Sequence, residues 1–142
     1  MLTVVAALIE HEGRLLVCQR RKDDTFGLQW EFPGGKVRPG EALPTALARE
    51  LREELGVSAL VGGELYRTRH RYKELSTEIE LIFFTVQVDP EAIRNRVFEQ
   101  MLWAQPAELP AMDFLPADRD LVSKLATGQL PITGQPRKPI KA

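Results

Sequence analysis

The chain has one cysteine, two histidines and a net charge of only −1 in 142 residues. Cys18 therefore cannot form an intramolecular disulfide, and it lacks the Cys and His partners of a zinc site. It follows the apolar residues Leu15 to Val17, so we expect a small buried side chain. A charge this close to zero gives no general field for binding a nucleic acid polymer or a membrane surface.

The apolar start of the chain, Met1 to Ile9, is far shorter than a membrane span and has no basic residues before it. We interpret it as a buried first strand and expect a cytoplasmic protein with no membrane-spanning segment. The length is enough for one domain with its own core. We expect this domain to cover residues 1–127, followed by a poorly ordered tail, 128–142, that is rich in proline, glycine and basic residues.

The clearest helix is predicted at Leu43 to Leu55, where leucines repeat every four residues and Gly56 provides a stop. A second helix is predicted at Pro116 to Leu125. Apolar and β-branched segments predict strands at 2–9, 14–20, 30–32, 59–72, 77–88 and 97–103, with the third ended by Pro33-Gly34-Gly35. This order predicts an α/β fold with a mixed sheet between helices.

Three acids of the first helix, Glu50, Glu53 and Glu54, stand at i, i+3 and i+4 and share one stripe. Like charges so placed cost about 0.2–0.5 kcal/mol per pair in an isolated helix. A hard divalent cation would reverse that cost, because Mg²⁺ prefers oxygen ligands between carboxylates and substrate phosphates. The alternative is a solvated acidic face that pairs with Arg49 and Arg52.

The context of this helix favours the metal site. Gly35 is followed at fixed intervals by Glu41, Arg49-Glu50-Leu51, Glu53-Glu54 and Gly56-Val57. This arrangement resembles the Nudix box at every specified position. The resemblance extends from Leu2 to about Leu125, and it implies the Nudix α/β/α sandwich and a hydrolase that acts on phosphoanhydride bonds, with a small nucleotide as substrate.

The resemblance also implies residue roles. Glu50, Glu53 and Glu54 would hold Mg²⁺, or Mn²⁺ as a substitute, with the carbonyl of Gly34 or Gly35 nearby. Glu50 or Glu53 would help to deprotonate or orient the attacking water. Arg49 and Glu41 would brace the loop and orient these acids. Cationic side chains that could meet the phosphates are those of Arg21 and Lys36.

Other segments bear on the substrate. Residues 15–21 followed by 30–36 resemble the MutT branch, which hydrolyses damaged nucleoside triphosphates to the monophosphate and pyrophosphate. Asp113 to Asp118 resembles the segment where that branch binds the base. The first expectation is therefore 8-oxo-dGTP, in a role of nucleotide-pool sanitation and DNA repair. Phe32 would line the base pocket or, equally, pack in the core.

Asp118 departs from MutT, which has Asn at that position. An ionised Asp only accepts hydrogen bonds, so it suits a base that offers a donor, such as cytosine N4. A related (deoxy)cytidine triphosphate pyrophosphohydrolase branch carries Asp there, which makes a pyrimidine triphosphate the second expectation. Asp118 would otherwise, or in addition, act as the N-cap of the last helix.

A further Glu of the MutT pattern is replaced here by Val97. Glu99, two residues later and on the same face of the predicted strand, is the candidate extra metal ligand or base, with a plain surface acid as the alternative. Asn95 and Glu80 are weaker substitutes.

Rival functions share the same box. An ADP-ribose or dinucleoside-polyphosphate hydrolase would use Tyr66 or Tyr72, and a non-catalytic nucleotide-binding Nudix module is the remaining alternative. The sequence is compatible with a monomer or a homodimer.

Overall fold

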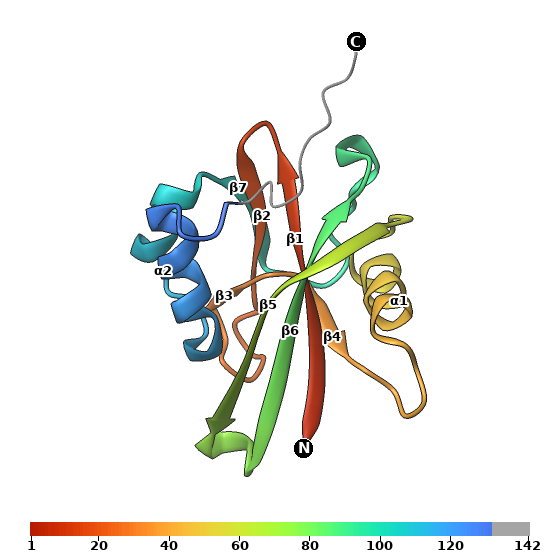
Figure 1. The fold of residues 1–142 in the computed structure, drawn as a ribbon, viewed down its shortest axis with the longest axis vertical. Coiled ribbons are helices and arrows are strands. Elements are labelled where there is room, and N and C mark those ends of the chain that lie inside the picture. Colours follow the sequence, from red (N-terminus) through yellow and green to blue (C-terminus); the bar gives the residue numbers. More distant parts are fainter. Residues whose placement is uncertain (132–142) are drawn as a thin grey trace.

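The computed structural model describes residues 1–131, in which seven strands form one sheet with helices on both sides (Figure 1). The strand order is β3-β2-β1-β6-β5, with β4 paired to β1 and β7 paired to β2. The strands are β1 (Leu2–His11), β2 (Arg14–Gln19), β3 (Trp30–Glu31), β4 (Gly34–Lys36), β5 (Leu60–Tyr72), β6 (Thr77–Gln87) and β7 (Gln100–Ala104). The helices are α1 (Leu43–Leu55) and α2 (Arg119–Thr127), with short 3₁₀ turns η1 (Lys73–Leu75), η2 (Pro90–Ala92), η3 (Pro106–Ala111) and η4 (Pro116–Asp118).

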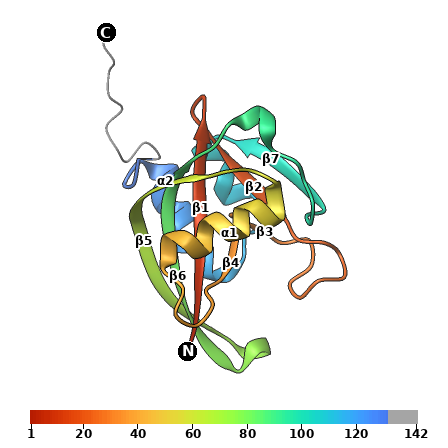
Figure 2. The ribbon, with the colours of Figure 1, turned by 90° about the vertical axis from the view of Figure 1, so that its right-hand side faces the viewer.

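The sheet is mixed, because β1 runs parallel to β6 and antiparallel to β2 and β4. Helix α1 crosses one face of the sheet, while α2 and the 3₁₀ turns beside it cover the other (Figures 1 and 2). Alternate residues of β1 belong to the two cores: Ala6 and Leu8 lie on the α2 side, and Val5, Ala7 and Ile9 lie on the α1 side. The predicted α/β/α arrangement is confirmed.

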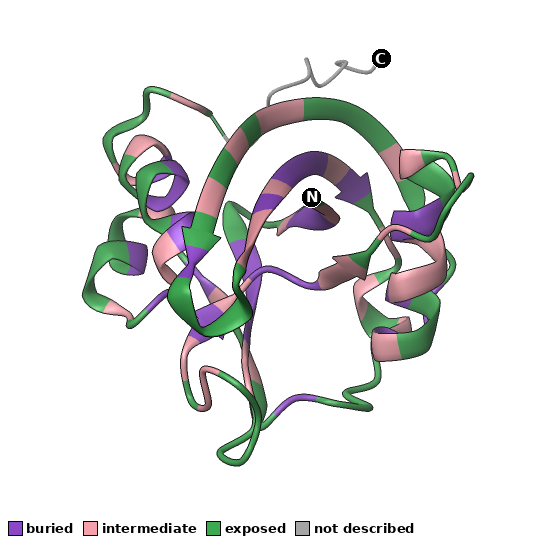
Figure 3. Cartoon of the chain, turned by 90° about the horizontal axis from the view of Figure 1, so that it is seen from below, coloured by how far each residue is buried: buried purple, intermediate pink, exposed green. Residues whose placement is uncertain are grey.

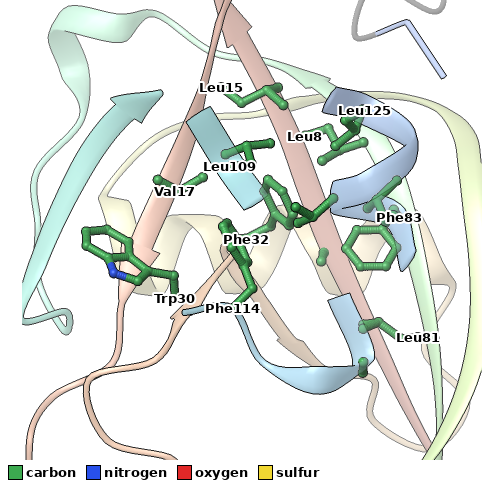
Figure 4. Packing of buried hydrophobic residues seen from close by; sticks show 14 of the residues in the cluster. Leu8, Leu15, Val17, Trp30, Phe32, Leu81, Phe83, Leu109, Phe114 and Leu125 are labelled. Carbon is green, nitrogen blue, oxygen red and sulfur yellow. The ribbon is translucent and has the colours of Figure 1, made fainter. Parts of the chain in front are cut away.

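The core on the α2 side is rich in aromatic rings. Phe32 contacts Phe83 edge-on, with ring centroids 6.0 Å apart, and Phe114 at 5.3 Å (Figure 4). Burial of each such side chain contributes about 1.5–3 kcal/mol. Seen from below, β5 is mostly exposed or intermediate, while β6 beside it is largely buried (Figure 3). Several residues of the aromatic cluster, Phe32 among them, also line the pocket described below.

Helix α1 has the predicted bounds, and the Gly56 that follows it as C-cap adopts the left-handed conformation with φ 69°. The side chains of Leu47, Leu51 and Leu55 are completely buried against the sheet, and Cys18 lies in the same core. The expectation of a buried Cys18 is thus confirmed. Because the leucines fix the rotation of the helix, its acidic stripe is held in one orientation.

The sequence prediction missed one strand and misplaced the start of another. The strand β3 ends before Pro33 as expected, but Gly34 and Gly35 then begin β4, which pairs with β1 so closely that a Cβ on Gly34 would lie 2.0 Å from the Val5 carbonyl oxygen. The strand predicted at 97–103 begins only at Gln100. The Asn95 side chain accepts hydrogen bonds from the backbone N–H groups of Val97 and Phe98, and this turn keeps the preceding residues out of the strand.

The segment predicted as one C-terminal helix is divided into η4 and α2, and α2 ends at Thr127 before Gly128. Leu130 packs against the aromatic core. The proposed tail reaches Ala142, and its residues 132–142 lie outside the described residues, so the boundary at residue 127 stays a prediction. None of the helices within residues 1–131 is long and apolar enough to cross a membrane.

Candidate active site

The side chain of Glu50 in α1 lies against the backbone of Gly35 in β4. A Cβ on Gly35 would lie 2.3 Å from the Glu50 carboxyl carbon, so only glycine admits this approach. The Glu50 side chain is 16% exposed and accepts a hydrogen bond of 3.0 Å from Arg49 Nη1. Burial raises the pKa of Glu50, and the Arg49 guanidinium opposes that rise.

Glu54, one turn further along α1, accepts a hydrogen bond of 3.2 Å from the backbone N–H of Gly34. Burial, followed by the negative charges of Glu31 and Glu50, raises the pKa of Glu54 to about 9. Glu50 and Glu54 therefore flank the same two glycines, where backbone and carboxylate oxygens are concentrated.

Glu53 does not join them. Its side chain is 52% exposed and lies 3.8 Å from Arg38 Nη2 and 3.5 Å from Arg49 Nη1. In residues 1–131 no group of three or more His, Cys, Asp or Glu side chains is already arranged to hold a metal ion. The sequence correctly places three acids on one stripe, but in this geometry only two of them face the glycines.

Arg49 connects the helix to the loop before it. Its Nε and Nη2 donate to the two carboxylate oxygens of Glu41 at 2.8 and 2.9 Å, and Nη2 also donates to the carbonyl oxygen of Lys36. The hydrogen bonds from Arg49, with one from the Arg38 backbone, lower the pKa of Glu41 to about 2. Neither Arg49 nor Glu41 lines the pocket beside Glu50.

That pocket has a volume of about 480 Å³ and extends from α1 and β4 to the η4 turn. From α1 and β4 the lining includes Glu50, Glu54 and Lys36 beside the glycines. From the α2 side it includes apolar and aromatic side chains, among them Phe32, and Asp118 of η4. Phe32 thus lines the pocket and also packs in the core, so its position is compatible with both of the roles expected for it.

Asp118 is only 3% exposed. Its backbone occupies the N-cap position of α2, but its side chain makes no cap hydrogen bond, so the expected capping contact is wrong. Within residues 1–131 the Asp118 carboxyl makes no side-chain hydrogen bond or ion pair, and burial, with the charge of Glu31, raises its pKa well above the usual range. These conditions favour the neutral acid, which donates as well as accepts, and not the acceptor-only carboxylate expected from the sequence.

Comparison with known proteins fits this geometry. The NUDIX domain model matches residues 1–125. The chain belongs to the Nudix family. A CTP pyrophosphohydrolase of Escherichia coli is 39% identical over 123 residues, which are 86% of this chain and 89% of that protein. The nucleoside triphosphatase NudI of Escherichia coli is 34% identical over 82% of this chain and 91% of its own length.

Among solved structures, a MutT protein from Methanosarcina mazei superposes with a TM-score of 0.79 over 90% of this chain and 94% of its own, at 24% identity. This similarity concerns the fold. Together the matches confirm the prediction of a MutT-like Nudix hydrolase that acts on phosphoanhydride bonds.

Nudix hydrolases generally need a divalent metal. The residues of this chain fit one, because the donors beside Gly34 and Gly35 are oxygens, the hard ligands that Mg²⁺ prefers. Glu50 and Glu54 are close enough in the pocket for the charge of one to raise the pKa of the other. A cation between them would remove that repulsion.

Two residues expected at the Nudix site lie elsewhere. Arg21 donates from Nε to the carbonyl oxygen of Val97 at 2.8 Å, and Glu99 is exposed, with its backbone N–H bonded to the Gln19 carbonyl. Among the described residues, the pocket lining includes neither of them. Glu99 does not lie on a strand face, because β7 starts one residue later, at Gln100.

The other weaker candidates are also accounted for. Asn95 forms the turn before β7, and Glu80 is paired with Arg67. Tyr66 bonds to Asp120, whereas Tyr72 lines the pocket and its hydroxyl accepts a hydrogen bond from the backbone N–H of Ala117.

Sequence reasoning missed Arg20 and Glu31, which both line the pocket. Arg20 Nη1 lies 3.1 Å from Glu31 Oε1, and the pair is partly buried. The available signal was the charged Glu31 between the apolar residues Trp30 and Phe32, in a segment predicted to be a strand. A charge in such a position is rarely buried without a function or a partner.

Proposed function

We propose that this Nudix hydrolase cleaves a nucleoside triphosphate to the monophosphate and pyrophosphate, with a cytosine-type base as its preferred substrate. The observation that carries the proposal is that one pocket is lined both by the glycine-backed acids of α1 and by Asp118 of η4, whose carboxyl has no hydrogen-bond partner among residues 1–131. The triphosphate of a nucleotide needs acidic side chains that hold a metal, whereas its base needs apolar side chains with a hydrogen-bonding group. The sugar joins these two parts of the substrate.

At the phosphate end, we propose that Glu50 and Glu54 hold Mg²⁺, with Mn²⁺ as a substitute, beside the Gly34 and Gly35 carbonyls. When bound, the metal would neutralise phosphate charge and lower the pKa of bound water. Glu50 or Glu53 would orient the attacking water and accept its proton. Lys36, which lines this end, would meet a phosphate oxygen.

Arg49 would act through Glu50. Its bonds to Glu41 and to the Lys36 carbonyl fix the guanidinium, and the fixed guanidinium in turn holds the Glu50 carboxylate. Water adds across the phosphoanhydride bond between the α- and β-phosphates, and its two hydrogens are distributed between the two products or released to solvent.

At the base end, a neutral Asp118 offers one O–H donor and one carbonyl acceptor. Cytosine presents an N3 acceptor beside an N4 amino donor, which is the complementary pattern. The 39% identical relative named CTP pyrophosphohydrolase supports this choice. Phe32 would contact the flat face of the base.

Oxidised guanine is the second candidate. Its N7–H donor next to the O6 acceptor also complements a neutral carboxyl, so Asp118 by itself does not exclude 8-oxo-dGTP. Pocket shape and the remaining contacts would then decide between the two bases. We further propose a cytoplasmic protein that is a monomer or a homodimer, which light scattering would distinguish.

The deciding experiment is a panel of nucleotides assayed with Mg²⁺, with pyrophosphate and phosphate detected separately. The panel would include CTP, dCTP, 8-oxo-dGTP, UTP, ADP-ribose and a dinucleoside polyphosphate. Pyrophosphate release with the highest kcat/KM for a cytosine nucleotide is the expected result. Phosphate release alone, or turnover confined to ADP-ribose or the dinucleotide, would refute the proposal, and nucleotide binding without turnover would indicate the non-catalytic module.

A further inference from the structure

Glu31 lines the pocket from β3, a strand that is held on both sides. It pairs with Cys18 of β2, and its neighbour Trp30 forms a bridge to Phe114. Trp30 donates to the Asp113 carbonyl at 2.9 Å and accepts from the Leu115 N–H at 3.0 Å. The backbone of β3 is therefore fixed to the segment that carries Asp118 at the same time as to the sheet.

Glu31 shares one pocket lining with Glu50 and Glu54 of α1 and with Asp118 of η4. Because β3 is paired with β2 and hydrogen-bonded to the segment before η4, the Glu31 carboxyl is held in the same cavity as the acids that would face the phosphates and the carboxyl that would face the base.

Arg20 holds the Glu31 carboxyl but does not occupy all of its hydrogen-bond acceptor positions. Its Nη1 lies 3.1 and 3.3 Å from the two Glu31 oxygens, while its Nε donates to the Thr25 carbonyl at 2.7 Å. Carboxylate oxygens together offer about four acceptor positions, so some remain for a ligand. No other hydrogen bond to the Glu31 side chain is present within residues 1–131.

We propose that Glu31 accepts a hydrogen bond from a hydroxyl group of the nucleotide sugar, with Arg20 as the residue that positions it. The proposal rests on the proposed function, because the sugar is what joins a base at one end of this pocket to phosphates at the other. Acidic side chains bind ribose hydroxyls in the same way in dinucleotide-binding folds.

The test compares CTP, dCTP and 2′,3′-dideoxy-CTP, which share the base and the phosphates and differ only in sugar hydroxyls. We expect the wild-type enzyme to lose about 10- to 100-fold in kcat/KM when the contacted hydroxyl is removed, mostly through KM. In Glu31→Ala this preference should fall to within about threefold. A merely structural role would lower activity on all three nucleotides by the same factor and leave the ratio intact.

Glu12→Ala, in the exposed β1–β2 turn, is the matched control and should keep the wild-type ratios. If Glu31→Ala does not fold, Glu31→Gln replaces it, since the uncharged amide accepts more weakly and should still reduce the preference. Equal wild-type activity on the three nucleotides, or an unchanged preference in a folded Glu31 variant, overturns the sugar contact alone. A wild-type enzyme that hydrolyses none of the three overturns the proposed function, and the sugar contact with it.

Discussion

The carboxyl group of Glu50 packs directly on the backbone of Gly35, in space that any other residue's Cβ would fill. Gly35→Ala should therefore displace the Glu50 carboxyl, since the end of a flexible side chain moves more easily than paired strands. We expect a loss of about 100-fold in kcat/KM with the fold retained. Gly63→Ala, where no atom lies within 4 Å of the added methyl, is the control. Full activity of Gly35→Ala would show that this contact is unimportant.

The last two acids of the α1 stripe, Glu53 and Glu54, should both be needed for turnover. Glu53→Gln and Glu54→Gln each replace a carboxyl group that can bind metal or accept a proton by a neutral amide of similar size, so both variants should fold and lose at least about tenfold in Mg²⁺-titrated activity. Activity would be measured over a range of Mg²⁺ concentrations, because a lost ligand also weakens metal binding. Full activity of both variants would contradict the mechanism. Loss in Glu54→Gln alone would indicate that Glu53 stays with Arg38 and Arg49 during catalysis.

Asp118→Asn tests the protonation state of the base-binding carboxyl. If Asp118 is neutral, Asn preserves its donor and acceptor pattern, and the cytosine preference should change by no more than about threefold at neutral pH. The raised pKa of Asp118 means that the wild-type enzyme ionises this group as pH rises, which removes the donor. The ratio of wild-type to variant kcat/KM should consequently fall toward alkaline pH. A shift of the variant toward oxidised guanine at neutral pH would instead indicate an ionised Asp118.

The Glu41–Arg49 pair should make stability sensitive to acid. Glu41 has its pKa lowered from 4.5 to about 2 in the folded protein, so its contribution is present above pH 4.5 and is lost as pH falls toward 2. Thermal unfolding followed by circular dichroism should show Glu41→Gln less stable than wild type near neutral pH, with the difference shrinking in this acid range. A difference that stays constant with pH would mean that Glu41 stabilises the loop by packing alone.

Much of the fold follows from local patterns. The bounds of α1 follow from its leucine repeat and Gly56, and the presence of β1 follows from its apolar run. The start of β7 was mispredicted because the Asn95 turn competes with strand pairing, a preference that hydrophobic patterning does not contain. The β4 strand was missed because its glycines, typical of turns, serve here for close approach to β1.

The sequence by itself determined the family, the reaction class and the acidic stripe of α1, since all of these depend on spacings within one continuous segment. Only the tertiary structure decided which distant side chains meet. It brought Glu31 and Arg20 into the pocket in place of Glu99 and Arg21, because strand pairing fixes which residue faces inward. It also gave Asp118 an environment that favours a neutral acid, since burial and a neighbouring carboxylate are properties of the folded chain and not of any local motif.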